Sequence, residues 1–92
     1  MQFEWDAGKD RINLRKHGVS FFEAQTVFGD PFSLTFHDPD HSDDETRFID
    51  IGMSAQGRLL VVIYTERGDH IRIISSREAT TTEEEAYEQA NA

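Results

Sequence analysis

The sequence predicts an α+β fold with two N-terminal helices, a four-stranded antiparallel sheet and a short C-terminal helix. The sheet is indicated by residues 58–77, where two runs of apolar and β-branched residues flank Gly68, which can supply the positive φ of a hairpin turn. The first run is apolar without a break from Leu59 to Tyr64, which favours a strand in mid-sheet that is covered on both faces. The helices are indicated by capping signals before and after the strands.

Two helices are expected before the sheet. Asp6 is placed to cap a first helix over residues 7–17, and Gly18 suits the left-handed position after its end. Ser20 and Glu23 have the spacing of a capping box, so a second, short helix is predicted to begin there.

The first two strands of the sheet are expected at residues 32–36 and 46–53. Residues 37–45 between them are predicted to form an acidic loop, because Pro39 and the clustered aspartates cannot continue a strand. Residues 54–57 then turn the chain back into the hairpin, which gives four antiparallel strands.

The length of 92 residues fits one domain, with residues 1–77 as its core and 78–92 as an acidic C-terminal helix or tail. Thr80 and Glu83 have the spacing of a further capping box, which predicts a helix over residues 81–90. The absence of cysteine fits a reducing compartment and excludes disulfides and cysteine-based zinc sites. No apolar run approaches the roughly 20 residues of a membrane-spanning helix, so we expect a cytoplasmic protein without a membrane segment.

The formal net charge of −9 argues against contact with nucleic acid at first sight, because phosphate contacts need Lys and Arg. The distribution of charge changes this interpretation. All nine basic residues lie at or before Arg77, whereas residues 78–92 hold five acids and no base. A local basic face is therefore compatible with the sequence.

The acidic loop invites a metal interpretation, since Asp38, Asp40, Ser42 and Asp44 alternate like the start of a calcium loop. The pattern fails at its sixth position, where Asp43 stands in place of Gly, and at its twelfth, where a bidentate Glu is missing. We therefore predict a solvated loop, with no metal site and no cofactor.

Several blocks of the chain, in register over residues 3–80, resemble the BrnT family, the toxin half of a bacterial type II toxin–antitoxin pair. The resemblance rests on Phe3-Glu4-Trp5-Asp6, Asn13-Leu14-Arg15-Lys16-His17-Gly18-Val19-Ser20, Glu23-Ala24, Val27-Phe28, Asp30-Pro31, Glu45-Thr46-Arg47-Phe48, Ile51-Gly52, Arg58-Leu59-Leu60-Val61-Val62, Tyr64-Thr65-Glu66-Arg67-Gly68-Asp69, Ile71-Arg72-Ile73-Ile74-Ser75, Arg77 and Ala79-Thr80. It implies a RelE-like fold, metal-independent cleavage of RNA that inhibits growth, and neutralisation by a BrnA-type antitoxin. It leaves open whether the chain forms a homodimer or a toxin–antitoxin heterotetramer.

The chain departs from the family pattern at its acidic end. After Ala79-Thr80 such toxins usually continue into a basic segment, whereas this chain has Glu83-Glu84-Glu85, and Glu78 stands where a base is more usual. Both changes weaken attraction to RNA phosphate. A second hypothesis is therefore a catalytically weak module that acts by binding an antitoxin or a copy of itself.

RNA can be cut without a metal if a base activates the 2′-hydroxyl, cations stabilise the developing negative charge, and an acid protonates the leaving oxygen. Arginine suits the second task because its planar guanidinium binds phosphate oxygens in pairs and stays charged. The candidate catalytic residues are arginines for the charge, a histidine for the base and a tyrosine for the acid: Arg77, Arg47, Arg72, His17 and Tyr64. The candidate RNA-binding residues, beside the histidine at the end of the first helix, are Lys16 and Arg15.

Purely structural roles stay open for two of these arginines. Arg72 lies inside a strand, where a buried ion pair with Asp50 is an alternative to a phosphate contact. Arg47 could pair with Glu45 or Glu66 instead of RNA.

The other candidates have structural alternatives as well. Tyr64 could be a core aromatic, and Lys16 and His17 could simply stabilise the C-terminal end of their helix. Arg58 and Arg67 border turns and are interpreted as solvated surface, outside the site.

The turns of the predicted sheet also assign its two faces. One face is expected to carry Arg47, Tyr64 and Arg77, and the other Arg72, His70 and Asp50. A bulge near a strand end would move Arg77 across.

Overall fold

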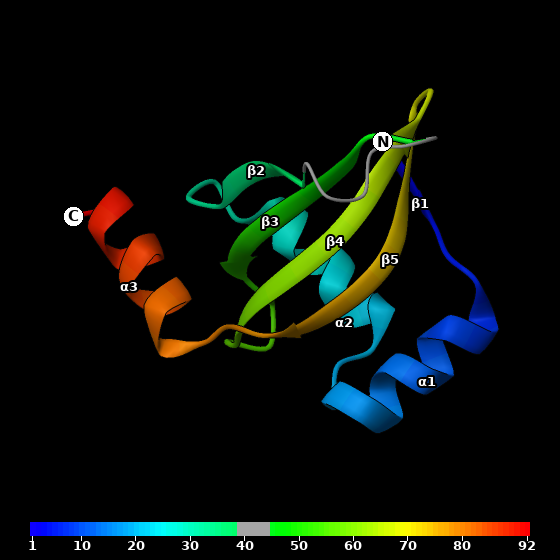
Figure 1. The fold of residues 1–92 in the computed structure, drawn as a ribbon, viewed down its shortest axis with the longest axis horizontal. Helices are drawn as coiled ribbons and strands as arrows, with labels where there is room; N and C mark the ends of the chain where they lie inside the picture. Colours follow the sequence, from blue (N-terminus) through cyan, green and yellow to red (C-terminus); the bar gives the residue numbers. More distant parts are fainter. Residues whose placement is uncertain (39–44) are drawn as a thin grey trace.

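The computed structural model describes residues 1–38 and 45–92 and has an α+β architecture. Its strands form one mixed, five-stranded sheet in the order β1-β5-β4-β3-β2 (Figure 1). The strands are β1 (Gln2–Glu4), β2 (Leu34–Asp38), β3 (Arg47–Met53), β4 (Leu59–Arg67) and β5 (His70–Glu78). The helices are α1 (Ala7–His17), α2 (Phe21–Gln25), the 3₁₀-helix η1 (Thr26–Gly29) and α3 (Thr81–Ala90).

The helix ends lie where the capping signals predict them. The Asp6 side chain accepts a hydrogen bond from the Lys9 amide at 2.9 Å, and Gly18 ends α1 with a φ of 70°. The capping box of Thr80 and Glu83 at the start of α3 is complete. These predictions are confirmed because a helix cap is decided by residues within one turn of it.

The prediction of four strands is wrong by one. Residues 2–4 form β1, which runs parallel to β5 with Phe3 opposite Ile71, so the sheet is mixed and not purely antiparallel. A strand of three residues is too short to show the alternation that identifies strands in a sequence. The four strands β2 to β5 are antiparallel, as predicted.

The strand before the predicted acidic loop starts and ends two residues later than expected. Pro31 and Phe32 form a turn in which the Phe32 amide donates to Asp30 at 2.9 Å, so β2 starts only at Leu34 and extends through Asp38. The calcium-like stretch that was interpreted as a solvated loop lies mostly in residues 39–44, outside the described residues.

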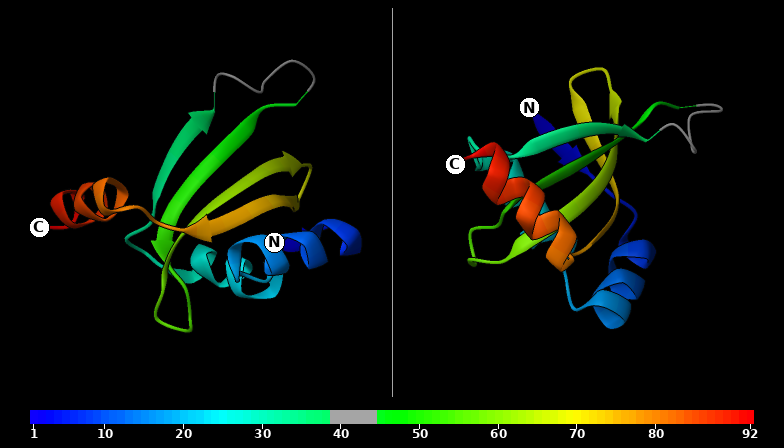
Figure 2. Two further views of the ribbon diagram at one scale, coloured as in Figure 1. Left: turned by 60° about the horizontal axis from the view of Figure 1, so that its bottom comes forward. Right: turned by 60° about the vertical axis from the view of Figure 1, so that its left-hand side comes forward.

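Helices α1 and α2 lie on one side of the sheet, and α3 lies at the opposite side of the molecule from α1 (Figures 1 and 2). The core lies between α2 and the sheet. Its buried residues come from the α1–α2 connection, α2, η1, β4 and β5: Val19, Phe21, Ala24, Val27, Leu60, Val62, Tyr64, Ile71 and Ile73. We call the sheet face that carries Leu60, Val62 and Tyr64 the covered face and its opposite the open face.

A β-bulge in β5 decides which side chains reach the open face. Ile63 pairs with Ser75 but Tyr64 pairs with Ile73, so Ile74 is an extra residue in β5. Side chains alternate between faces, and the extra residue reverses that alternation beyond it. Arg72 and Arg77 therefore lie on the same face although five positions separate them.

The predicted face assignment was accordingly wrong for Tyr64 and Arg72, whereas Arg47 and Arg77 share a face as predicted. Thr65 of β4 pairs with Arg47 and Arg72, and Val61 of β4 pairs with Arg77. Because Val61 and Thr65 alternate along β4 with residues of the covered face, all three arginines lie on the open face. The covered face instead carries Tyr64 and Asp50.

Asn13 fixes α1 against the edge of β5. β1 pairs only with residues 70–72, and beyond them the Asn13 amide bonds the backbone of Ser76 in both directions. Its nitrogen donates to the Ser76 carbonyl at 2.8 Å, and its oxygen accepts from the Ser76 amide at 3.1 Å. The same nitrogen donates to the Val19 carbonyl at 2.8 Å. This buried side chain takes the place of a neighbouring strand.

Arg58 was predicted to be a solvated surface residue, and this prediction is wrong. Its guanidinium donates to both carboxylate oxygens of Glu23, at 3.0 Å from Nε, and to the Gly18 carbonyl at 2.9 Å. Glu23 is 7% exposed and also accepts from the Ser54 hydroxyl at 2.8 Å. The Arg58 hydrogen bonds hold the pKa of Glu23 below its usual range. The Glu23 carboxylate, which was predicted to complete the capping box of α2, therefore joins α2 to the β3–β4 turn instead. The other half of that box forms, because the Ser20 hydroxyl accepts a hydrogen bond from the Glu23 amide at 3.0 Å.

Candidate functional site

The candidate site lies on the open face, where the three candidate arginines are brought together. Arg47 projects from β3, and Arg72 and Arg77 project from β5. β4 lies between these strands and contributes Val61, Ile63 and Thr65 to the same face.

At the hairpin end of this face, Arg47 and Arg72 share one cross-strand row with Thr65 between them. Arg72 faces Glu4 of β1, with 3.6 Å between the nearest charged atoms. The predicted alternative of a buried ion pair between Arg72 and Asp50 is wrong, because Asp50 lies on the covered face.

The neighbouring Arg67 binds Glu45 with distances of 2.7 and 2.9 Å. Its hydrogen bonds hold the pKa of Glu45 below its usual range. Glu45 was one of the two acids considered as partners for Arg47. Arg67 itself is exposed, as predicted.

Arg77 is held by the acidic end of the chain. Its Nη1 and Nη2 donate to the two carboxylate oxygens of Glu83 at 2.8 and 2.9 Å. The Arg77 hydrogen bonds lower the pKa of Glu83 to about 2. The Glu83 oxygen that meets Nη1 also accepts from the Thr80 amide at 2.8 Å, so the capping box orients the carboxylate toward the guanidinium.

Two polar contacts anchor the rest of α3. The Tyr87 hydroxyl donates to Asp30 at 2.6 Å, and the Asn91 amide donates to the Phe32 carbonyl at 3.2 Å. The Asp30 hydrogen bond raises the pKa of Tyr87 to about 12. No residue of α3 is buried, so the helix is attached by its side-chain contacts and not by a core.

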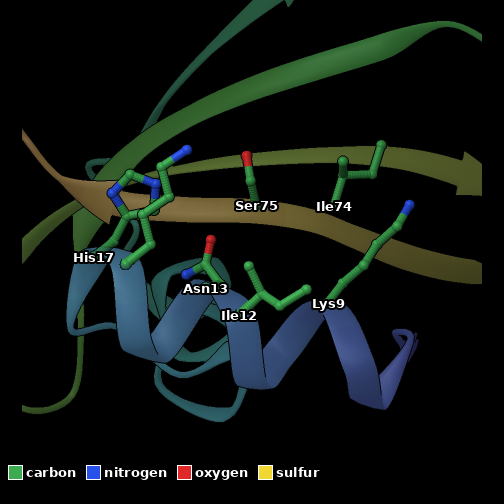
Figure 3. Close-up of a pocket in the computed structure, with 7 residues that line it drawn as sticks. Lys9, Ile12, Asn13, His17, Ile74 and Ser75 are labelled. Carbon is green, nitrogen blue, oxygen red and sulfur yellow. The ribbon is translucent and has the colours of Figure 1, made fainter.

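The C-terminal half of α1 borders a hollow of about 200 Å³ beside β5. Figure 3 shows Ser75 of β5 between His17 and Lys9, with Ile12 and Asn13 below the strand. The hollow is lined by residues of α1 and β5: Lys9, Ile12, Asn13, Lys16, His17, Ile74 and Ser75. Two predicted site residues, Lys16 and His17, thus meet β5 two residues before Arg77, whereas Arg15 is exposed and outside the lining.

Tyr64 is separated from the arginines by the sheet itself. It is 4% exposed on the covered face, and its hydroxyl donates to Asp50 at 2.9 Å. Burial, followed by the hydrogen bond to Asp50, raises the pKa of Tyr64. Burial likewise raises the pKa of Asp50. Phe28 and Phe48 pack on the tyrosine ring at centroid distances of 4.9 and 5.5 Å.

Sequence reasoning missed Ser75 and the pairing of Glu83 with Arg77. The spacing of Arg77 and Glu83 on either side of a helix cap could have indicated the ion pair, because a capping-box glutamate points back along the chain. Ser75 has no such signal, since its face depends on the bulge.

Within residues 1–38 and 45–92, no group of three or more His, Asp or Glu side chains is arranged to hold a metal ion. The described helices include none that is long and apolar enough to span a membrane.

The fold and the open face define a small α+β protein with cationic side chains gathered on one sheet surface, as proteins that bind polyanions have. The model of the ribonuclease toxin family BrnT, of type II toxin–antitoxin systems, matches residues 5–83. The chain therefore belongs to the BrnT family of toxins, and this membership implies an antitoxin partner.

A solved structure supports the same assignment. The chain is similar to the Brucella abortus ribonuclease toxin BrnT, with a TM-score of 0.65 and 25% sequence identity. The similarity covers 88% of this chain and 99% of the Brucella protein. No curated protein matches the sequence.

Proposed function

We propose that this chain is the toxin of its pair, with a RelE-like fold, and that it is an endoribonuclease, which cuts RNA on the open face without a metal and thereby inhibits translation and growth. The observation that supports this most is the common face of Arg47, Arg72 and Arg77. Guanidinium groups fixed on a rigid sheet can bind backbone phosphate and stabilise the charge that develops during cleavage.

In this proposal His17 is the general base. Histidine is the side chain that most often serves this purpose, and His17 lies in the hollow beside Ser75. It accepts the proton of the 2′-hydroxyl, whose oxygen attacks the adjacent phosphorus while the bond to the 5′ oxygen breaks. The products are a 2′,3′-cyclic phosphate and a 5′-hydroxyl, whose proton comes from the imidazolium or from water.

The cations divide between binding and catalysis. Arg77, two residues from Ser75 along β5, stabilises the charge on the phosphate under attack, while Lys16 and Arg15 bind the RNA backbone beyond it. Tyr64 takes no part in this scheme because it lies across the sheet, bonded to Asp50.

The antitoxin is proposed to be of the BrnA type and to act in the cytoplasm. It would neutralise the toxin either one to one or in a heterotetramer built on a toxin homodimer. Family membership supports the partner, and its stoichiometry is part of the proposal.

A second candidate function is a binding module without effective catalysis. The pairing of Arg77 with Glu83 favours it, because the guanidinium then offers a phosphate none of its paired donors. In that case the chain would act through its antitoxin or through a second copy of itself.

Induction of the chain alone in a bacterial host separates the two functions. If the chain is a ribonuclease, its induction should arrest growth and degrade cellular RNA. Arg77→Ala should then abolish both the growth arrest and the RNA degradation. Growth arrest with intact RNA, or no arrest, would favour the binding module. If Arg77→Ala arrested growth like the parent, the assigned role of Arg77 would be wrong.

A further inference from the structure

Thr65 on β4 carries a polar atom that the fold leaves without a partner. The residue is 1% exposed, and within residues 1–38 and 45–92 its Oγ1 forms no hydrogen bond. Such an atom is unusual, because a buried hydroxyl loses its hydrogen bonds to water and must replace them within the protein. Valine has the same shape without this loss. A threonine at this position is therefore unexplained by packing alone.

The neighbours of Thr65 indicate what its partner would be. Arg47 pairs with it on one side and Arg72 on the other, and all three side chains lie on the open face. Adjacent strands are about 4.8 Å apart, so the two arginines start roughly 10 Å apart with the hydroxyl between them. Two guanidinium groups at this spacing can close on one phosphate above the hydroxyl.

The acid beside Arg72 leaves hydrogen-bond donors on that guanidinium. Glu4, opposite Arg72, is 3.6 Å away, beyond hydrogen-bonding distance, so the Arg72 guanidinium keeps N–H groups for another acceptor. The pKa of Glu45 indicates a positive potential near the row. Hydrogen bonds from Arg67 lower this pKa most, and the charges of Arg72 and Arg47 lower it further. At the other end of the row, Asp38 lies opposite Arg47 in register.

We propose that Arg47, Thr65 and Arg72 form a binding site for a backbone phosphate of RNA, in which Thr65 Oγ1 donates a hydrogen bond to a phosphate oxygen. The inference rests on the proposed function and adds to it a second phosphate contact besides Arg77. Arg77 pairs with Val61, four residues from Thr65 along β4, or about 13 Å away. The two sites therefore hold different phosphates of one strand and fix its direction across the open face.

The test compares Thr65→Val, which removes only the hydroxyl, with Thr65→Ser, which keeps it. Thr82→Val, at an exposed position of α3, is the matched control. The probe is a short single-stranded RNA carrying 2′-O-methyl groups, which cannot be cut by attack of the 2′-hydroxyl. Its affinity is measured at low salt, and the melting temperature of each variant is measured without RNA.

We expect Thr65→Val to weaken binding about tenfold and to leave the melting temperature equal or higher, since an unpaired buried hydroxyl is removed. Thr65→Ser and Thr82→Val should bind like the parent. A purely structural hydroxyl would not give this combination of lower affinity with unchanged or greater stability. Equal affinity of Thr65→Val and the parent overturns the proposal.

The remaining outcomes distinguish the phosphate site from the catalytic proposal. If the parent binds the probe through Thr65 but does not cut unmodified RNA, the catalytic proposal fails and this site stands. If the parent does not bind the probe at all, the site is overturned. Should Thr65→Val not fold, the Thr65 methyl signal of the parent is followed by NMR during titration with the probe. A change in that signal larger than that of the Thr82 methyl supports the contact, and no such difference overturns it.

Discussion

Glu83 places its two carboxylate oxygens 2.8 and 2.9 Å from the two terminal nitrogens of Arg77. Guanidinium binds phosphate through the same pair of donors, so this carboxylate occupies the position that the proposed function assigns to RNA. The acidic end of the chain was expected to oppose RNA binding through its charge. In the structure, Glu83 is the acidic residue of this end that hydrogen-bonds to Arg77.

The first prediction concerns release of Arg77. Glu83→Gln should raise RNA affinity roughly tenfold and make the logarithmic salt dependence steeper by about 0.7, the value for one more contact to single-stranded phosphate. Glutamine still serves in a capping box, so α3 should remain folded. Binding is measured over a series of salt concentrations.

Glu84→Gln is the control for this prediction, because it makes the same change in charge on the same exposed turn without touching Arg77. An equal gain in affinity for both variants would mean that only the net charge of α3 matters. No gain for either would place α3 away from the RNA.

The second prediction is a titration. Because hydrogen bonds from Arg77 lower the pKa of Glu83 to about 2, from an ordinary 4.5, the pairing stabilises the docked α3 fully above pH 4.5. This stabilisation should decline below pH 4.5 and be lost as the pH falls through 2. The carboxyl carbon of Glu83, followed by NMR, should titrate near 2 in the parent and closer to 4.5 in Arg77→Ala. The same midpoint in both proteins would show that Arg77 does not hold the carboxylate in solution.

The third prediction compares two ion pairs near the ends of β4, one of Arg58, just before the strand, and one of Arg67, its last residue. Arg58→Ala leaves the buried Glu23 carboxylate without its main partner and should lower the free energy of unfolding by about 2–4 kcal/mol. Arg67→Ala breaks an exposed pair with Glu45 and should cost less than about 1 kcal/mol. Urea denaturation measures both. Similar losses for the two variants would contradict the assigned burial of Glu23.

The fourth prediction concerns the edge of β5. Asn13→Asp removes the donor that reaches the Ser76 and Val19 carbonyls and places a negative charge beside them, so stability should fall by about 3 kcal/mol. Asn91→Asp makes the same chemical change at an exposed position and should cost less than about 1 kcal/mol. A small loss for Asn13→Asp would show that α1 is held to the sheet by other contacts.

The sequence predicted those features of the fold that depend on residues close together in the chain. Asp6, Gly18 and Thr80 mark helix ends because each cap is completed within one turn, and Gly68, with a φ of 62°, marks the hairpin. Contacts distant along the chain were missed, such as that between Arg58 and Glu23, because nothing local identifies such a partner.

The candidate arginines were chosen from their chemistry and their positions on strands, and the bulge at Ile74 determines that they share a face. A single extra residue in a strand has no periodic signature, yet it reverses every side chain beyond it. The first strand was missed for a related reason, since residues 2–4 pair only with the distant β5.

If the open face cleaves RNA by attack of the RNA 2′-hydroxyl on the adjacent phosphate, the chemical ends of the products show it most directly. The purified chain is incubated with RNA in the presence of EDTA, beside Arg77→Ala, and the fragment ends are identified by mass spectrometry. We expect fragments with 2′,3′-cyclic phosphate and 5′-hydroxyl ends, no cleavage of 2′-O-methyl RNA, and no fragments from Arg77→Ala. Fragments with 3′-hydroxyl and 5′-phosphate ends, or cleavage that EDTA abolishes, would contradict this mechanism.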